Sequence, residues 1–202
     1  MKKLLVAVFA VFALSAASFA GGWGLGIKLG AGQNDPKTLK DAHTSGTLTK
    51  SPGVFALEGL YEWDLNGKKF KQVGSENKIG LRFGFDFYGE NKLEQGGATA
   101  KEDTTSLPIT VYYKHDSGIK KVSWYAGAGL TFIQTKFEIP GDTIKEDKTF
   151  PHIMAGAEYR FSKLFALGLD LKYNFSAKIT KRDAVLSDRT GLQGVLAARF
   201  YF

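Results

Sequence analysis

Cysteine is absent from the 202-residue chain, and histidine occurs only three times. Without thiols the chain can form no disulfide bond, no thiolate metal site and no cysteine nucleophile. His43, His115 and His152 lack the spacing of a metal-binding motif. Two Ser-x-x-Lys strings, at 75–78 and 117–120, fall in expected turns rather than on a helix. We therefore predict a protein that uses no cofactor or metal and that is not an enzyme.

Helical periodicity and a concentrated basic region are also missing. No segment after residue 20 repeats apolar residues every 3.6 positions, which argues against a helical fold. The formal net charge is +7, from 27 basic and 20 acidic side chains. Because the basic residues are scattered among acidic ones rather than gathered on one helix or stripe, nucleic-acid binding is not predicted.

A long unbroken apolar run occurs only near the N-terminus, at residues 4–14. Two lysines precede it, and Ser18 and Ala20 place small residues at the two positions that signal peptidase reads. The run is too short to cross a bilayer comfortably. We therefore predict a cleaved signal peptide at residues 1–20 and one mature domain at residues 21–202, with an uncleaved anchor as the alternative.

The rest of the chain shows alternation with a period of two. Apolar residues alternate with polar or small ones along eight runs, which are separated by stretches rich in Gly, Asn, Asp, Ser, Thr and Lys. Most runs are near the ~9–11 residues of a tilted membrane-spanning strand, and an even number suits a closed antiparallel barrel. The runs are residues 23–32, 54–64, 78–88, 107–114, 122–137, 150–161, 164–175 and 191–202.

The connections between these runs alternate in length. Long polar connections are expected at one end of such a barrel and short turns at the other. The connection 65–77 departs from this order and contains the turn signal Asn66-Gly67. The turn at 162–164 should hold three residues, so that Phe161 and Phe165 face the same way. The four long connections, which we interpret as solvated loops, are 33–53, 89–106, 138–149 and 176–190.

Aromatic residues concentrate at the ends of the expected strands. Two aromatic girdles on either side of an apolar band are typical of strands anchored at membrane interfaces. At the end with the short turns these are Trp23, Trp63, Trp124, Tyr113, Tyr159 and Phe202. At the opposite end they are Phe55, Phe87, Phe132, Tyr173 and Phe175.

Alternation alone leaves open which face points outward. A soluble barrel of the lipocalin kind would turn the apolar face inward around a ligand. The polar face of this chain is rich in glycine, which suits a crowded interior, and the apolar face carries more Phe and Leu than a narrow lumen could hold. We therefore expect the apolar face to contact lipid and the polar face to line the lumen.

The expected lumen would contain charges of both signs in nearly equal number. Charges in such a space must be paired or hydrated, and eight strands leave an interior that side chains can fill. We predict a packed network of ion pairs. The alternative is a narrow gated channel, in which Glu58, Arg82, Glu158 and Arg199 would be the gating residues. The network residues are Glu58, Glu62, Arg82, Asp86, Lys114, Glu158, Arg160, Asp170, Lys172 and Arg199.

The last run, which ends in Phe200, Tyr201 and Phe202, is typical of the closing strand of an outer-membrane barrel. Together with the segment AGAEYRFSKLFALGLDLKYNF at 155–175, it makes the chain similar to the small OmpA/OmpX-type, porin-family barrels of bacteria. This resemblance implies an all-β, eight-stranded antiparallel up-and-down transmembrane barrel in the outer membrane of a diderm bacterium.

The same resemblance implies how such a barrel is assembled and used. It implies contact with outer-membrane lipid and insertion by the barrel assembly machinery, which reads the terminal strand at Phe200 and Phe202. It further implies a structural or surface-interaction role without a cofactor, in which the loops could bind a surface ligand. Some barrels of this size modify lipid A, but no histidine–serine motif on the lipid face resembles theirs.

Overall fold

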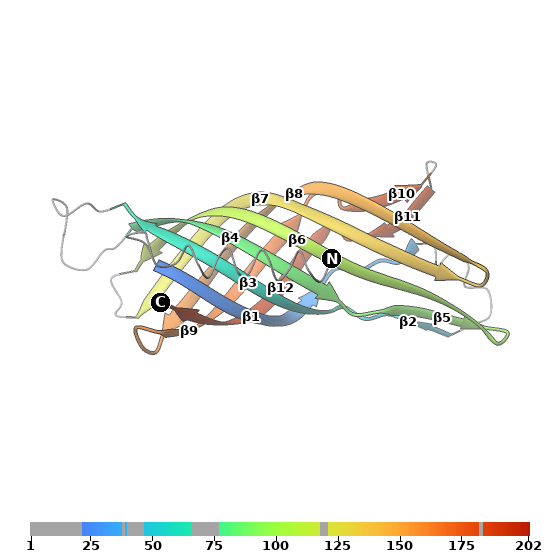
Figure 1. Cartoon of the computed structure of the whole chain (residues 1–202), viewed down its shortest axis with the longest axis horizontal. Helices are drawn as coiled ribbons and strands as arrows, with labels where there is room; N and C mark the ends of the chain where they lie inside the picture. Colours follow the sequence, from blue (N-terminus) through green and yellow to red (C-terminus); the bar gives the residue numbers. More distant parts are fainter. Residues whose placement is uncertain (1–21, 38, 40–46, 66–76, 118–120, 182–183) are drawn as a thin grey trace.

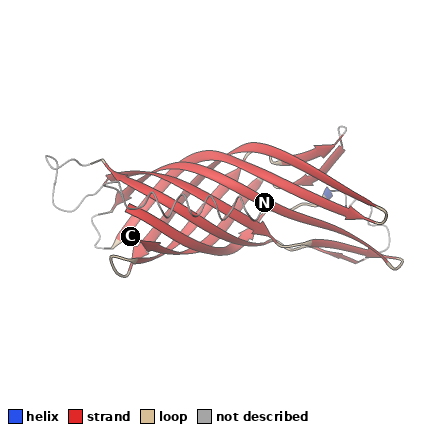
Figure 2. Cartoon of the chain, viewed as in Figure 1, coloured by secondary structure: helices blue, strands red, loops and turns tan. Residues whose placement is uncertain are grey.

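The computed structural model describes residues 22–37, 39, 47–65, 77–117, 121–181 and 184–202. The expected signal peptide and most of the connection 65–77 lie outside these residues. The described chain is almost entirely strand, and its long strands run at a steep tilt around one axis (Figures 1 and 2). Among the described residues, no helix is long and apolar enough to cross a membrane.

Eight strands form a closed barrel. Each pairs antiparallel with its neighbours along the chain, and the first pairs with the last, as Leu25 opposite Phe200 shows. This confirms the all-β, eight-stranded, up-and-down barrel. The barrel strands are β1 (Gly22–Gly32), β3 (Gly53–Asp64), β4 (Asn77–Tyr88), β6 (Ala98–Asp116), β7 (Val122–Ile139), β8 (Asp142–Arg160), β9 (Phe165–Asn174) and β12 (Gly191–Tyr201).

The apolar face of these strands points outward. Leu169 is 49 % exposed and Leu196 is 67 % exposed, whereas Glu58 is 2 % exposed and Arg199 is fully buried. Such an exterior is stable only when a bilayer covers it. A soluble barrel with an apolar interior is therefore the wrong alternative for this chain.

Two barrel strands, β6 and β8, are much longer than the sequence indicated. β6 begins nine residues and β8 eight residues before the expected run, whereas β7 ends only two residues after its run, so the interpretation of 89–106 and 138–149 as loops is wrong. Their alternation is carried by Thr, Lys, Glu and Asp rather than by apolar residues. The strands are stabilised by cross-strand pairs such as Lys101 opposite Glu138, each of which contributes about 0.2–1 kcal/mol.

Four short strands lie outside the eight barrel strands among the described residues. β5 (Asn91–Gln95) pairs with β6 through Gly96 and Gly97, which adopt φ values of 58° and 81° that favour glycine. β2 (Thr47–Thr49) pairs with β5. Between β9 and β12, β10 (Lys178–Lys181) pairs with β11 (Ala184–Asp188) as a separate two-stranded sheet. Neither 33–53 nor 176–190 is thus a simple loop.

The result is a barrel with a projecting sheet. We use this name for β2, β5 and the parts of β6, β7 and β8 that continue past the other strands, residues 98–105, 132–139 and 142–149. Figure 1 shows it at the end opposite the C-terminus. The β10–β11 hairpin lies at the same end.

The end with the chain terminus carries the short turns. The turn at 162–164 holds three residues as expected: the Phe161 amide donates to the Phe165 carbonyl at 3.0 Å. The Ser162 hydroxyl accepts hydrogen bonds from the amides of Leu164 and Phe165. The Phe161 and Phe165 rings lie on the same face, 5.8 Å apart.

Candidate functional site

Arg199 lies at the centre of the lumen, on the inner face of β12. Its Nε donates to Glu58 Oε1 at 2.6 Å, and its Nη2 donates to both oxygens of Asp170, at 2.7 and 2.6 Å. Its Nη1 donates to the Tyr125 hydroxyl at 2.8 Å. One guanidinium therefore joins β12 to β3, β7 and β9.

Two further cations complete this central group. Lys28 Nζ lies 2.5 Å from Glu58 and 3.0 Å from Asp170. Arg82 Nη1 donates to Asp170 Oδ2 at 3.1 Å. The Arg82 guanidinium also lies 4.8 Å from the ring centres of both Tyr112 and Tyr125, where cation–π attraction adds to the ion pairs.

A second group lies between this centre and the end with the C-terminus. Lys114 Nζ donates to Glu158 at 2.5 Å and to Glu62 at 3.0 Å. The Tyr201 hydroxyl donates to Glu158 at 2.7 Å, and the Tyr112 hydroxyl donates to Glu62 at 2.9 Å. Arg199 Nη1 reaches Glu158 at 3.5 Å and connects the two groups.

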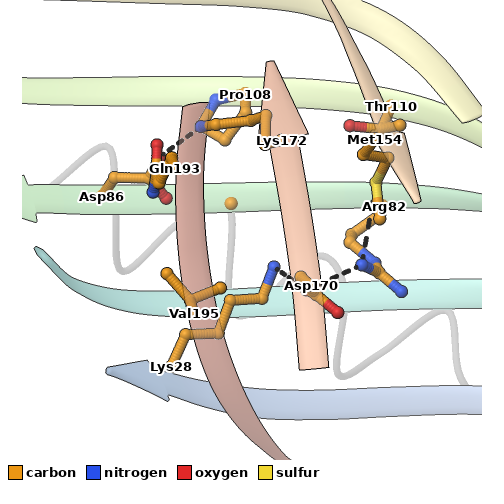
Figure 3. Close-up of a pocket in the computed structure, with 11 residues that line it drawn as sticks. Lys28, Arg82, Asp86, Pro108, Thr110, Met154, Asp170, Lys172, Gln193 and Val195 are labelled. Atoms are coloured by element: carbon orange, nitrogen blue, oxygen red, sulfur yellow. Dashed lines mark hydrogen bonds and ion pairs between the residues drawn. The ribbon is translucent and has the colours of Figure 1, made fainter. Parts of the chain in front are cut away.

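A third group lies toward the projecting sheet. Lys172 donates to Asp86 at 2.9 Å, and the Ser106 hydroxyl donates to the same carboxylate at 3.2 Å. Between these residues and Asp170 is a cavity of about 30 Å³. Figure 3 shows Lys28 and Arg82 converging on Asp170 at one side of this cavity, with Lys172 and Asp86 at the other. The cavity has room for about two water molecules.

His152 is held by two hydroxyls, one of which belongs to Thr110 at the edge of the cavity. Its Nε2 lies 2.8 Å from Thr110 Oγ1, and its Nδ1 lies 2.9 Å from Thr131 Oγ1. The ring is buried and both nitrogens are engaged. Among the described residues, no group of His, Cys, Asp and Glu side chains has the arrangement of a metal site.

Glycine on the inner face makes room for these groups. A Cβ atom on Gly80 would lie 2.3 Å from the Tyr112 ring, and one on Gly168 would lie 2.4 Å from Arg199 Nη1. Both distances are far inside van der Waals contact. The glycine-rich polar face therefore belongs to a crowded interior.

The structure brings all ten lumen residues singled out in the sequence into the three groups. Nine of them are fully or largely buried, and Arg160 lies at the rim with 29 % of its side chain exposed. Arg160 contacts Glu158 at 3.4 Å and its guanidinium lies 4.5 Å from the Tyr201 ring centre.

Sequence reasoning missed a further buried ion pair. Arg189 Nη2 donates to Glu102 Oε1 at 2.9 Å, in stretches that were interpreted as loops. The sequence contains only a weak signal for this pair. Glu102, Thr104 and Ser106 lie at every second position before Thr110, so polar residues continue the inward face of β6.

Several aromatic residues of the outer surface lie near the strand ends that carry the short turns. Trp63, Trp124 and Tyr159 are exposed. Tyr61 faces outward but is covered, because the rings of Trp23 and Trp63 pack on either side at 4.7 and 4.4 Å. At the C-terminus, Phe200 and Phe202 are exposed, and the Phe202 amide donates to the Trp23 carbonyl at 2.8 Å.

A closed antiparallel barrel with an apolar exterior and an ion-paired interior defines an integral outer-membrane β-barrel protein. A family model described as the outer membrane protein beta-barrel domain matches residues 4–200. The chain belongs to this family, and its location is the outer membrane. In this class the short turns face the periplasm, so the projecting sheet lies outside the cell.

Solved structures share this fold. Ail of Yersinia pestis, in a complex with the heparin analogue sucrose octasulfate, has 15% sequence identity and a TM-score of 0.54, with 91% of this chain and 100% of that chain covered. The N-terminal barrel domain of Pseudomonas aeruginosa OprF has 11% identity and a TM-score of 0.52, with coverages of 90% and 97%.

Neisserial surface protein A has 12% identity and a TM-score of 0.52, with coverages of 91% and 98%. No curated protein sequence matches the chain.

Proposed function

We propose that this protein is a surface-interaction barrel, in which ion-paired side chains close the lumen and the projecting sheet contacts a partner outside the cell. The length of three strands carries the proposal. β6, β7 and β8 have 18 or 19 residues, whereas a tilted strand needs about 9–11 to span the membrane. About eight residues of each, or about 25 Å, therefore continue beyond the bilayer as paired strands.

The outer face of the projecting sheet presents ordered charges. Lys136 pairs with Glu138 along β7, which raises the pKa of the lysine and lowers the pKa of the glutamate through a shared hydrogen bond. Gln134 donates to Asp147 on β8 at 3.0 Å. A rigid strand surface loses less conformational entropy on binding than a mobile loop, so this sheet suits a charged extracellular polymer.

The lumen supports a non-catalytic role in this proposal. Its carboxylates are engaged by cations or tyrosine hydroxyls, as Glu158 is by Lys114 and Tyr201. Removal of residues 1–20 as a signal peptide, and insertion by the barrel assembly machinery through Phe200 and Phe202, belong to the same proposal. Trp23, Trp63, Trp124 and Tyr159 would anchor the barrel at the periplasmic interface.

Adhesion of cells that produce the protein tests the proposed contact. The comparison is between the natural chain and a variant in which residues 137–144, at the tip of the β7–β8 hairpin, are replaced by Asn-Gly, a favoured two-residue turn. Immobilised polylysine and a cultured cell monolayer serve as probes, because the replaced tip carries two carboxylates, Glu138 and Asp142, and no basic side chain. We expect the shortened variant to lose adhesion.

A matched control is Leu196→Ala, on the lipid-facing side of β12 and outside the projecting sheet. This variant keeps the length of the sheet and its net charge. Equal adhesion of the natural and shortened proteins to both probes, with equal amounts at the surface, would contradict the proposed contact.

A further inference from the structure

The β10–β11 hairpin lies against the inner wall of the projecting sheet. It forms its own two-stranded sheet, and among the described residues it joins the rest of the structure by one isolated bridge, Asp35 to Asp188. Lys148 Nζ donates to the Lys178 carbonyl at 2.6 Å. The hairpin is therefore attached by side chains and a single bridge rather than by the barrel's ladder of hydrogen bonds.

Apolar packing holds the underside of this hairpin. Its buried residues Ala177, Ile179 and Leu186 pack in one cluster with residues that face the lumen. Those partners, on β7 and β8, are Ile133, Phe137 and Phe150, with Ile144 at the edge of the cluster. Above the charged network the lumen wall thus includes an apolar area on β7 and β8, and the hairpin covers it.

One ion pair joins the base of the hairpin to β6. Arg189 is 1 % exposed, and its Nη2 donates to Glu102 Oε1 and to Thr104 Oγ1, each at 2.9 Å. The Ser187 hydroxyl donates to the same Glu102 oxygen at 2.9 Å. The guanidinium also lies 4.5 Å from the ring centre of Tyr88. We call the Arg189–Glu102 pair the latch.

Only some of the hydrogen-bonding atoms of the latch have a partner. Nε and Nη1 of Arg189 and Oε2 of Glu102 are buried without a hydrogen-bond partner among the described residues. Buried donors and acceptors of this kind lose their hydration without compensation. Opening the hairpin returns them to water, which lowers the cost of breaking the pair.

The segment that contains the hairpin has a positive φ at both ends. Ser176 has a φ of 50° and Gly191 has a φ of 129°. The φ of Gly191 lies in a range that L side chains rarely adopt, so the position favours glycine. The neck between them is closed by the Arg189 amide, which donates to the Ala177 carbonyl at 3.0 Å. These two positions are suited to act as hinges.

We propose that the β10–β11 hairpin is a hinged lid over the extracellular mouth of the lumen, held shut by the Arg189–Glu102 latch. It closes the lumen independently of the Arg199 network below it. The inference does not depend on which partner the projecting sheet binds.

The absence of natural cysteine allows a direct test. Thr135 is fully buried next to the latch, where its hydroxyl lies 3.1 Å from Thr104 Oγ1. A single Thr135→Cys substitution reports access to the space beneath the lid, and Thr143→Cys, on the exposed tip of β8, reports full access. Labelling uses a membrane-impermeant maleimide on intact cells that produce the full chain.

We expect Thr135→Cys to label slowly and Thr143→Cys to label rapidly. Adding Glu102→Gln should raise the rate at Thr135→Cys by about tenfold or more, because labelling follows the population of the open state. Gly191→Ala should raise the rate as well, through strain at the hinge. Asp170→Asn, in the network below, and Glu138→Gln, on the outer surface, should leave it unchanged.

Two results would overturn the lid. One is equal labelling at the two cysteines in the otherwise natural chain. The other is an unchanged rate at Thr135→Cys with both Glu102→Gln and Arg189→Lys. Folding of every variant is checked by its migration without boiling in a detergent gel, and Arg189→Lys serves in place of Glu102→Gln if that variant does not fold.

Discussion

Arg199 and Glu58 meet across the lumen with 2.6 Å between Nε and Oε1, although 141 positions separate them in the chain. The same guanidinium also binds Asp170 through two hydrogen bonds. Because β12 pairs with β1 to close the barrel, this contact requires the closed barrel. Arg199 therefore joins strands from the beginning and the end of the chain.

We predict that Arg199→Ala strongly destabilises the folded barrel. The substitution leaves Glu58 and Asp170 with less compensation in a buried site, and loss of one partner of such a pair costs about 3–5 kcal/mol. Urea unfolding in lipid bilayers measures the change. Arg160→Ala is the matched control, because that side chain is partly exposed at the rim and should cost about 0–1 kcal/mol. Similar losses for the two variants would contradict a central role for Arg199.

Lys114 and Glu158 should show energetic coupling in a double-mutant cycle. Lys114→Met and Glu158→Gln each remove one charge from a pair that is 2.5 Å apart and almost fully buried. The double variant should lose less stability than the sum of the two single losses, with a coupling energy of about 0.5–3 kcal/mol. Additive losses would show that the two charges are stabilised by other partners.

Gly129 and Gly59 provide a test of the crowded interior. A Cβ atom on Gly129 would lie 1.9 Å from the backbone carbonyl oxygen of Ile109, whereas one on Gly59 would have no atom within 4 Å. Gly129→Ala should therefore destabilise the barrel by about 1–3 kcal/mol. Gly59→Ala should be neutral or stabilising by up to about 1 kcal/mol. The same unfolding measurement applies, and equal effects would contradict the close approach of β6 and β7.

The barrel itself could be predicted from the sequence because its signal is local. Residues such as Leu169 and Leu196 recur at every second position, and burial of the opposite face follows from the pleat. The three-residue turn at 162–164 followed from the requirement that Phe161 and Phe165 share a face. These inferences needed no knowledge of which strands are partners.

The projecting sheet and the lid could not be predicted in the same way. Residues 98–105 contain no large apolar side chain, so apolar periodicity begins only at Leu107 although the strand begins at Ala98. The pairing of Arg189 with Glu102 depends on the fold of a hairpin 85 or more positions away. The lumen groups were expected as a set, but their individual partners depend on strand tilt and register.

Planar-bilayer recordings should show no defined openings for the natural protein. The charged groups occupy the lumen, and the cavity among them is about 30 Å³, close to the space of two water molecules. Arg82→Ala should enlarge this cavity without creating a pathway, because Arg199 and Lys28 still bind Glu58 and Asp170. Leu196→Ala, on the lipid face, is the matched control.

The alternative, a narrow gated channel, predicts the opposite result in these recordings. If Glu58, Arg82, Glu158 and Arg199 were gating residues, the natural protein would show defined openings. The substitutions Glu58→Ala or Arg82→Ala would change or abolish these openings. Leu196→Ala would leave such openings intact, since its side chain contacts lipid rather than the lumen. Openings with this pattern would replace the closed lumen with a conduit for ions, while the outer-membrane location and the barrel fold would stand.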